Sequence, residues 1–283
     1  MLNKVEINGK KVFPVGIGTW KMGSNSSDES RELESIQVGI NAGAQVIDTA
    51  ETYGDGRSEK LVGKAIQKYE RDSLYLVSKV LPENASKNYL PISLERTLER
   101  MQVNYLDMYL LHWKSSIPLQ ETVEAMEQMK AAGKIKAWGV SNFDIADLKR
   151  LFSLPYGTKC LTNQIKYNLI YRGIEYDLLP YMNQHQMPLM AYSPVVKGKF
   201  GRFNSQQQKI LEEVAFNHQA TIQQILISWS IRGGNTISIP KSSNPDHMMD
   251  NIRAAHINLT NDELGKIDTV FHKPTSKESL ALW

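Results

Sequence analysis

Four side chains that can take part in proton transfer lie at or just after short apolar segments of this 283-residue chain. Asp48 ends the segment Val46–Asp48, and Tyr53 follows in the string Asp-Thr-Ala-Glu-Thr-Tyr-Gly. Lys79 and His112 each come directly after a later apolar segment. A carboxylic acid, a phenol, an amine and an imidazole are groups that general acid–base catalysis uses. Acid–base chemistry is therefore expected if the fold brings these four groups together.

Metal and thiol chemistry are disfavoured by the sequence. The six histidines show neither a His-x-x-x-His nor a His-Glu-x-x-His spacing, so we predict no metal site. The single cysteine, Cys160, excludes a disulfide within the chain and fits a reducing compartment. It lies at the start of a predicted strand without the sequence features of an activated thiol, so we interpret it as a core residue.

Eight short apolar segments alternate with longer segments of helical periodicity. Their centres are about 32 residues apart, which is the length of one strand–helix unit. Strands that alternate with helices predict a parallel sheet, and eight such units can close into a barrel. The predicted strands are Gly16–Thr19, Val46–Asp48, Leu74–Ser78, Leu106–Leu111, Ala137–Val140, Leu161–Gln164, Leu189–Tyr192 and Thr236–Ile239.

The segments between these strands carry helix signals. Apolar residues at every fourth position over Leu61–Tyr69 predict a helix, and we expect Ser58 to cap it. Asp144 is placed to cap a later helix through the backbone N–H groups that follow it. Near the C-terminus, Thr260 and Glu263 have the spacing of a capping box.

The predicted fold is α/β, a (β/α)8 TIM barrel with a short N-terminal β-hairpin. The dipeptide Asn8-Gly9 is typical of a two-residue hairpin turn. We place the hairpin at 1–15, the barrel at 16–256, and a C-terminal helix and tail at 257–283, all in one domain. An open doubly wound sheet is the main alternative. It is disfavoured because Gly16-Ile-Gly-Thr-Trp-Lys has lysine where the dinucleotide-binding fingerprint has its third glycine.

In such a barrel the active site lies at the carboxyl ends of the strands. Each predicted strand supplies a polar or aromatic residue there. Taken singly, Tyr192 also fits a packed core ring, Ser141-Asn142 a helix cap, and His112 a structural histidine. The residues expected at this end are Thr19, Trp20, Asp48, Lys79, His112, Trp113, Ser141, Asn142, Gln164, Tyr192, Ser193, Lys241 and Ser242.

Composition and charge exclude several other classes of protein. Lys and Arg total 33 against 30 for Asp and Glu, which leaves a net charge of +3, too dilute for a nucleic-acid-binding face. No segment approaches the roughly 20 apolar residues of a membrane span, and the N-terminus lacks the apolar run of a secretory signal. We therefore expect a cytoplasmic protein that binds neither nucleic acid nor membranes. We expect a monomer and leave an oligomer open.

The string over Asp48–Glu59 resembles the signature D-T-A-x-x-Y-G-x-x-x-S-E of the aldo-keto reductase family. Ser-Lys79 and Leu-His112-Trp at the next two strand ends are also typical of that family. Further similar strings are Gly-Val-Ser141-Asn-Phe, Asn-Gln164, Ala-Tyr192-Ser-Pro and Ile-Pro-Lys241-Ser. The resemblance extends from Gly16 to about Asn251. It is strongest to bacterial members that reduce methylglyoxal and related 2-oxoaldehydes.

This resemblance implies an NAD(P)H-dependent reductase that converts small aldehydes or ketones to alcohols. Tyr53 is implied as the general acid that protonates the carbonyl oxygen. An ammonium beside it favours the phenolate, so we expect Lys79 to lower the pKa of Tyr53. Asp48 holds Lys79 protonated and oriented. His112 polarises the carbonyl through a hydrogen bond that strengthens in the transition state.

The resemblance also implies which residues hold substrate and cofactor. Trp20, Tyr53, His112 and Trp113 surround the substrate, and the short loop and tail beyond them suit small carbonyl compounds. NADPH is the implied cofactor, with NADH as a second option. Its nicotinamide ring lies on Tyr192, and its carboxamide faces Ser141, Asn142 and Gln164. The contacts implied for the rest of the cofactor site are Thr19, Trp20, Asp48, Ser193, Lys241, Ser242, His247, Asp250 and Asn251.

The sequence departs from the family pattern at three positions. His247 stands where NADPH-preferring members usually have arginine, and Asp250 where glutamate is common. Histidine is mostly neutral at pH 7, so we expect a weakened preference for NADPH, which Lys241 still favours. Lys166 stands where glutamate often follows the Asn-Gln pair, and the sequence offers no explanation for it.

Two alternative functions stay open on the sequence. The first is a redox-sensing subunit that holds a nicotinamide cofactor tightly and turns over slowly. The second is a lyase or isomerase barrel in which Lys79 forms a Schiff base with a phosphorylated sugar. Trapping of a covalent adduct by borohydride would favour the lyase, whereas very slow cofactor release would favour the sensor.

Overall fold

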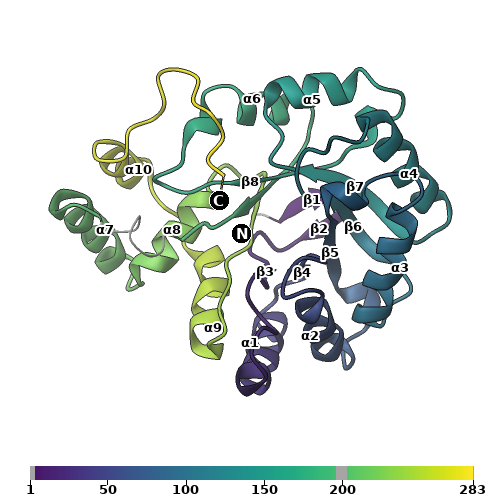
Figure 1. The fold of residues 1–283 in the computed structure, drawn as a ribbon. Helices are drawn as coiled ribbons and strands as arrows, with labels where there is room; N and C mark the ends of the chain where they lie inside the picture. The colour runs from purple at the N-terminus through teal and green to yellow at the C-terminus, as the bar shows by residue number, and fades with distance from the viewer. Residues whose placement is uncertain (1–3, 196–202, 283) are drawn as a thin grey trace.

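The computed structural model of the protein describes residues 4–195 and 203–282. Eight parallel strands lie side by side in sequence order (Figure 1). Backbone hydrogen bonds also join the first of them to the last, because Gly16 N donates to Ser238 O at 2.8 Å and Ser238 N to Pro14 O at 2.8 Å. The predicted (β/α)8 barrel is thus confirmed. Its strands are β3 Ile17–Gly18, β4 Val46–Asp48, β5 Tyr75–Val80, β6 Leu106–Leu111, β7 Ile135–Ser141, β8 Asn163–Lys166, β9 Leu189–Tyr192 and β10 Thr236–Ser238.

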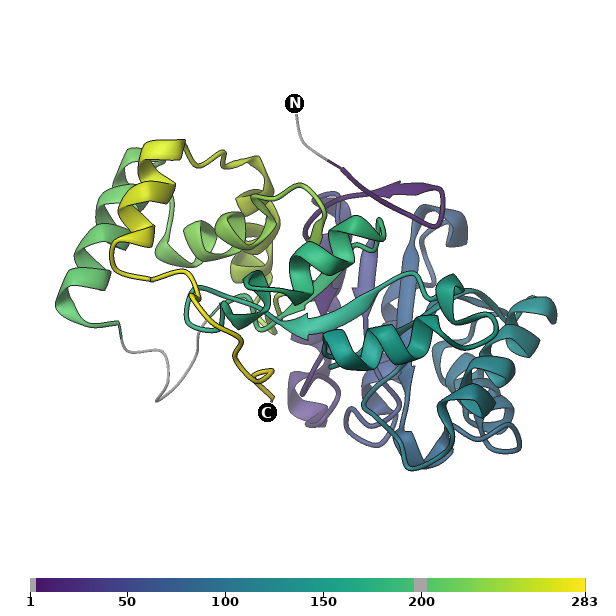
Figure 2. The same ribbon diagram turned by 90° about the horizontal axis from the view of Figure 1, so that it is seen from above.

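The predicted N-terminal hairpin is present as strands β1 Val5–Ile7 and β2 Lys10–Val12. Asn8 and Gly9 between them have φ of 50° and 71°, as a two-residue turn that follows the twist of the strands requires. The apolar side chains of the hairpin are buried in the same cluster as the residues inside the barrel. The hairpin therefore closes one end of the barrel, and the C-terminal tail lies at the opposite end (Figure 2).

Helices surround the barrel (Figure 1). Asp144 caps α5 in a reciprocal capping box with Asp147, and Thr260 with Glu263 caps α10, both as predicted. None of the helices in the described part of the chain has the length and apolar character needed to cross a bilayer. The helices are α1 Glu29–Asn41, α2 Arg57–Ile66, α3 Leu90–Met101, α4 Leu119–Ala131, α5 Ile145–Phe152, α6 Leu178–Gln184, α7 Ser205–Asn217, α8 Ile222–Ile231, α9 Pro245–Arg253 and α10 Asn261–Asp268.

The prediction that Ser58 caps α2 is wrong. The helix begins at Arg57, two residues before the start that a cap at Ser58 implies, and its N-cap is Gly56, whose φ of 80° glycine adopts at little cost. Ser58 therefore lies within the first turn, and its hydroxyl is fully buried. It donates to the hydroxyl of Thr19 at 2.8 Å, which ties α2 to the end of β3. A partner from another strand thus replaces the local backbone partner that the sequence suggested.

The alternation of side chains along the strands aims the polar strand ends into the barrel. Side chains two residues apart on a strand point to the same face of the sheet. Val46, Val77 and Leu110 belong to the inner core of the barrel. The residues two positions after them are Asp48, Lys79 and His112. The same alternation that fills the core thus carries these three groups to one end of the lumen.

Candidate active site

A buried ion pair lies at the centre of this end of the barrel. Lys79 Nζ is 2.8 Å from Asp48 Oδ2, and the two side chains are 0% and 3% exposed. Lys79 also donates to the carbonyl oxygen of Thr49 at 2.7 Å. Burial lowers the pKa of Lys79 from its ordinary value, and the negative charge of Asp48 acts in the opposite direction. Burial of such a pair costs desolvation energy. Removal of one partner leaves a buried uncompensated charge and lowers the free energy of unfolding by about 3–5 kcal/mol.

The second oxygen of Asp48 is held from across the barrel. Gln164 Nε2 donates to Asp48 Oδ1 at 2.7 Å, over a separation of 116 residues. Ser141 in turn donates its hydroxyl to the carbonyl oxygen of Gln164 at 2.9 Å. The backbone carbonyl of Asp48 accepts from the hydroxyl of Thr19 at 2.9 Å. Both carboxylate oxygens and the backbone of Asp48 are therefore fixed by groups from different strands.

Tyr53 reaches this ion pair from the loop between β4 and α2. Gly54, Asp55 and Gly56, which follow it, all have positive φ, so the loop turns tightly. The hydroxyl of Tyr53 accepts a long hydrogen bond from Lys79 Nζ at 3.4 Å, and Nζ lies 4.9 Å from the centre of the phenol ring. The phenol thus stands in direct contact with the ammonium, as the sequence implied.

The electrostatic effect on Tyr53 differs from the expectation. Burial, and then the charge of Asp48, raise the pKa of Tyr53 well above its ordinary value. The predicted lowering by Lys79 is wrong for the protein alone, because Asp48 compensates the ammonium and burial disfavours the phenolate. The phenol is therefore held in its protonated form, ready to donate.

His112 is buried beside the phenol and is neutral. Its ring lies edge-on to Tyr53, with the centroids 5.8 Å apart and the planes at 71°. On its other side it stacks on Trp113 at 3.7 Å and 14°. Burial, and then the charge of Lys79, lower the pKa of His112 to about 2. Its Nδ1 is buried and has no hydrogen-bond partner among the described residues. His112 thus offers a neutral imidazole with a ring nitrogen that is open to a hydrogen bond.

The residues expected around the nicotinamide form a connected network. Tyr192 donates its hydroxyl to Asn142 Oδ1 at 3.0 Å, and Asn142 Nδ2 donates to the hydroxyl of Ser141 at 3.1 Å and to the carbonyl oxygen of His112 at 3.3 Å. Asn142 has φ of 61°, a conformation that asparagine tolerates better than most residues. Since Asp144 caps α5, Ser141 and Asn142 do not serve as that cap. They join β9 to the tetrad of Asp48, Tyr53, Lys79 and His112.

The residues expected at the adenosine end gather where α9 begins. Lys241 donates to the hydroxyl of Ser243. Asn244 caps α9 by accepting from the backbone N–H groups of Asp246 at 2.8 Å and His247 at 3.3 Å. His247 is exposed, Asp250 is half-buried, and Asn251 is buried on the same helix. Ser242 is buried beside Lys241.

The remaining expected residues border the mouth. Trp20 is 40% exposed, and the amine of Lys21 lies 4.5 Å from the centre of its ring. Ser193 has φ of 50° at the end of β9, and its carbonyl oxygen accepts from Asn168 at 2.8 Å. The loop beyond it includes 196–202, which lie outside the described residues. The tail reaches the same side, since Lys166 donates to Leu282 O at 3.4 Å.

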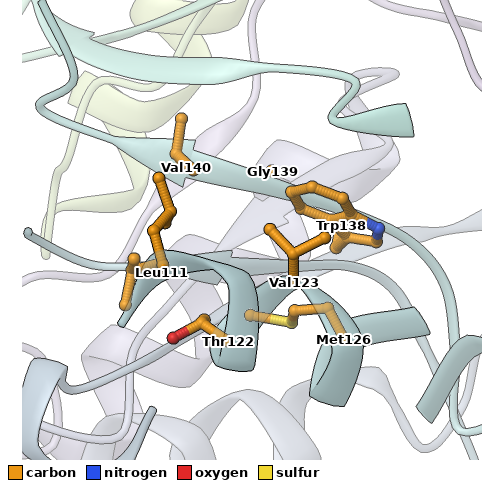
Figure 3. A pocket seen from close by; sticks show the side chains of 8 residues that line it. Leu111, Thr122, Val123, Met126, Trp138, Gly139 and Val140 are labelled. Carbon is orange, nitrogen blue, oxygen red and sulfur yellow. The ribbon is translucent and has the colours of Figure 1, made fainter. Parts of the chain in front are cut away.

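A small apolar cavity lies elsewhere, between α4 and the outer face of β6 and β7 (Figure 3). Its volume of about 10 Å³ is no larger than one water molecule requires. It is a packing gap between helix and sheet and has no connection with the tetrad. It is lined by Leu111, Leu119, Thr122, Val123, Met126, Trp138, Gly139 and Val140.

Comparison with known proteins assigns the family. A model of the aldo/keto reductase family matches residues 14–271. The chain belongs to the aldo/keto reductase family.

Methylglyoxal reductase YeaE of Escherichia coli is 41% identical over 277 residues, which cover 98% of this chain and 97% of that protein. A crystal structure of an aldo/keto reductase from Klebsiella pneumoniae in complex with NADP and acetate has a TM-score of 0.97 and 42% identity, with both chains fully covered. A thermostable aldo-keto reductase, Tm1743, crystallised with the inhibitor epalrestat, has a TM-score of 0.87 and 36% identity over 94% of this chain.

This aldo/keto reductase therefore catalyses an oxidation–reduction reaction, and its structure brings together residues that the sequence did not single out. Thr49 holds Lys79 through a backbone carbonyl, which no side-chain motif can signal. Glu32 is 4% exposed near the adenosine end, yet nothing in the spacing of α1 separates it from Glu29 or Glu34. Cys160 is buried, as predicted, and burial raises its pKa to about 12.

The burial of His112 predicts that its imidazole stays neutral throughout the range in which the reductase is folded. Nitrogen-15 NMR of the imidazole, assigned with His112→Gln, should show one neutral form without titration between pH 5 and 8, because the pKa lies near 2. The unfolded chain in urea is the control, in which the same ring should titrate near its ordinary pKa of about 6.5. Titration of His112 above pH 5 in the folded protein would contradict this prediction.

Proposed function

We propose that this reductase converts small aldehydes and ketones to alcohols with NADPH as hydride donor and with 2-oxoaldehydes such as methylglyoxal among its substrates. The observation that carries the proposal is the contact of the Tyr53 hydroxyl with the buried Lys79–Asp48 pair beside the neutral His112. Similarity to methylglyoxal reductase YeaE along nearly the whole chain supports the substrate class.

Tyr53 is the general acid in this mechanism. As hydride reaches the carbonyl carbon, negative charge develops on the oxygen, and the phenol transfers its proton there. The resting pKa of Tyr53 is raised, so the proton is present at neutral pH. The ammonium of Lys79, 3.4 Å from the hydroxyl, stabilises the phenolate only as it forms. This interaction is stronger in the transition state than in the ground state, which is what accelerates a reaction.

His112 polarises the substrate as a neutral donor. Stacking on Trp113 fixes the plane of the imidazole, and an N–H of the ring can donate to the carbonyl oxygen of a substrate bound beside Tyr53. Because the pKa of His112 is depressed to about 2, proton transfer to the substrate is assigned to Tyr53. A fixed neutral donor in a dry site still lowers the barrier by about 3–4 kcal/mol when charge develops on oxygen.

The residues of the site fit a nicotinamide dinucleotide. The aromatic ring of Tyr192 offers a stacking surface, and Ser141, Asn142 and Gln164 offer amide and hydroxyl groups beside it. Lys241, in the loop that leads into α9, suits a 2′-phosphate, because helix N-termini attract anions and the lysine adds a positive charge. The dinucleotide supplies the hydride, which no side chain can donate. The NADP-bound relative from Klebsiella pneumoniae supports this assignment. The lack of a permanent charge at His247 supports use of NADH as well.

The surroundings of the tetrad support small substrates. The tail is held across the mouth by Lys277, which pairs with Asp144 at the start of α5 and with Asp177 before α6. Trp20 and Trp113 stand at the border of the same opening. We assign the substrate contacts to Trp20, Tyr53, His112 and Trp113, and the substrates to aldehydes and ketones of a few carbon atoms, in line with the similarity to methylglyoxal reductase YeaE. The expectation of a cytoplasmic monomer stays a prediction.

The geometry disfavours the lyase alternative. A Schiff base needs an amine that is open to substrate, yet Lys79 is 0% exposed and directed to Asp48, Thr49 and Tyr53. A screen of a few dozen carbonyl compounds, each with NADPH and NADH, tests the proposed activity directly. Oxidation of the nucleotide with a 2-oxoaldehyde supports it, and no oxidation with any carbonyl compound would overturn it.

Replacement of Tyr53 by Phe removes the acid and leaves the ring in place. We expect turnover to fall about 10²–10⁴-fold, the usual contribution of a general acid, while the dissociation constant of NADPH stays nearly unchanged. The matched control is Tyr69→Phe, which makes the same change just after the C-terminal end of α2, away from the tetrad. Unaltered turnover in Tyr53→Phe would exclude Tyr53 as the acid.

Replacement of Lys79 by Met leaves Asp48 as an unpaired buried charge, which destabilises the fold by about 3–5 kcal/mol. Lys79→Met combined with Asp48→Asn avoids that charge and should restore much of the melting temperature. We expect both variants to lack measurable carbonyl reduction even at saturating nucleotide, since no cation is left to stabilise the phenolate. Full activity of the folded double variant would contradict the role of Lys79.

Replacement of His247 by Arg adds a permanent charge at the beginning of α9. One charge-assisted hydrogen bond of about 1.5–3 kcal/mol corresponds to a roughly 10- to 150-fold rise in the ratio of kcat/KM for NADPH to that for NADH. His185→Arg makes the same change at an exposed site just after α6 and should leave the ratio unaltered. An unchanged ratio in His247→Arg would show that this position does not contact the phosphate.

A further inference from the structure

A buried carboxylate joins the two loops that border the proposed nucleotide site. Glu32 lies in the first turn of α1 and is 4% exposed. Its Oε2 accepts from the backbone N–H of Gly23 at 2.7 Å, in the loop that carries Trp20. Its Oε1 accepts from the hydroxyl of Ser243 at 3.0 Å, in the loop between β10 and α9. Glu32 has no part in the proton-transfer chemistry of the tetrad, so its burial needs another reason.

The hydroxyl of Ser243 connects this carboxylate to the proposed phosphate-binding lysine. Lys241 Nζ donates to Ser243 Oγ, and Ser243 Oγ donates to Glu32. An ammonium, a hydroxyl and a carboxylate thus follow one another in a single chain of hydrogen bonds. Ser35, one turn further along α1, donates to the carbonyl oxygen of Ser242 at 2.7 Å. One face of α1 therefore holds the whole loop 241–243 in place.

This chain of hydrogen bonds has a different effect on each form of the nucleotide. A 2′-phosphate beside Lys241 brings two negative charges close to the carboxylate of Glu32, and in a partly buried site this repulsion is only weakly screened. The hydroxyl of Ser243 is already directed to Glu32 and cannot donate to the phosphate without taking this donor away from Glu32 Oε1. A ribose 2′-hydroxyl meets no such repulsion, and carboxylates are the usual partners of that hydroxyl in NAD-binding sites.

We infer that Glu32 is a specificity-determining residue that weakens binding of the 2′-phosphate and so allows the reductase to use NADH as well as NADPH. The inference rests on the proposed function, which assigns the 2′ position of the nucleotide to Lys241 and Ser242. Glu32 acts on the charge at that position, and His247 acts separately from the exposed face of α9. The two residues therefore make independent contributions to nucleotide preference.

The test measures nucleotide binding without turnover. Glu32→Gln removes the charge and keeps the size of the side chain and an oxygen that can accept from Gly23. Dissociation constants of NADP⁺ and NAD⁺ are measured by calorimetry, together with those of adenosine 2′,5′-bisphosphate and adenosine 5′-monophosphate. Loss of one nearby negative charge should shift the ratio of affinities toward the 2′-phosphorylated ligands by about 5- to 30-fold.

Two control variants separate charge from structure. Glu29→Gln makes the same change one turn earlier on α1, where the carboxylate pairs with Lys64 at the surface. It should leave the ratio unaltered. Glu32→Asp keeps the charge and shortens the side chain, so its ratio should stay close to that of the unmodified protein. If Glu32→Gln lowers the melting temperature, the rise in melting temperature with each dinucleotide gives the same comparison on the folded fraction.

The outcomes are distinct. A shift toward NADP⁺ in Glu32→Gln, absent in Glu29→Gln and Glu32→Asp, supports the inference. Equal weakening of both dinucleotides would show that Glu32 only holds the two loops together, and unchanged affinities would show that it is remote from the 2′ position; either result overturns the inference. Failure of the unmodified protein to bind either dinucleotide would instead overturn the proposed function.

Discussion

The ion pair between Lys79 and Asp48 is the interaction on which the rest of the site depends. Two opposite charges lie 2.8 Å apart with almost no exposure to solvent, an arrangement that is weak evidence for stability, because desolvation opposes the attraction. What the pair provides is a fixed cation beside Tyr53. Gln164 from β8 and the backbone of Thr49 complete its coordination, so a closed barrel is needed to hold it.

Burial also sets the charge state of Tyr53 and His112, the two groups that we propose contact the substrate. It raises the pKa of Tyr53 and lowers that of His112, so both are neutral before the reaction begins. The site at rest therefore contains one compensated ion pair and two neutral hydrogen-bonding groups. In the proposed mechanism, new charge appears only when the carbonyl oxygen accepts electrons, and Lys79 is already in contact with the Tyr53 hydroxyl. Such preorganisation requires no reorientation of solvent at the moment of reaction.

The proposed nucleotide end of the site differs from the tetrad in the groups that it contains and in how its loop is held. Its groups are hydroxyls, an amide, one lysine and an exposed histidine at the beginning of α9, and its loop is held by Ser35 and Glu32 of α1. Because α1 follows β3 and α9 follows β10, the closure of the barrel between these strands brings the two helices together. The proposed nucleotide site is thus held together by contacts between the first and the last units of the barrel.

The sequence by itself determined the architecture and indicated, through residue types at strand ends and a family resemblance, the four side chains that meet there. Eight apolar segments at regular spacing are enough to predict the barrel, and a period of two along each strand places Asp48, Lys79 and His112 on the inner face. These are local properties, since each depends on a few neighbouring residues and on the geometry of the strand. The caps at Asp144 and Thr260 were predictable for the same reason.

Only the tertiary structure decided which partners those residues meet. Gln164 donates to Asp48 from 116 residues away, Ser58 bonds Thr19 instead of capping α2, and Glu32 reaches Ser243 across the closure of the barrel. The pKa of Tyr53 rises where the sequence suggested a fall, because burial depends on everything packed around the phenol. Hydrogen-bond partners and desolvation arise from contacts between distant segments, which local spacing does not encode.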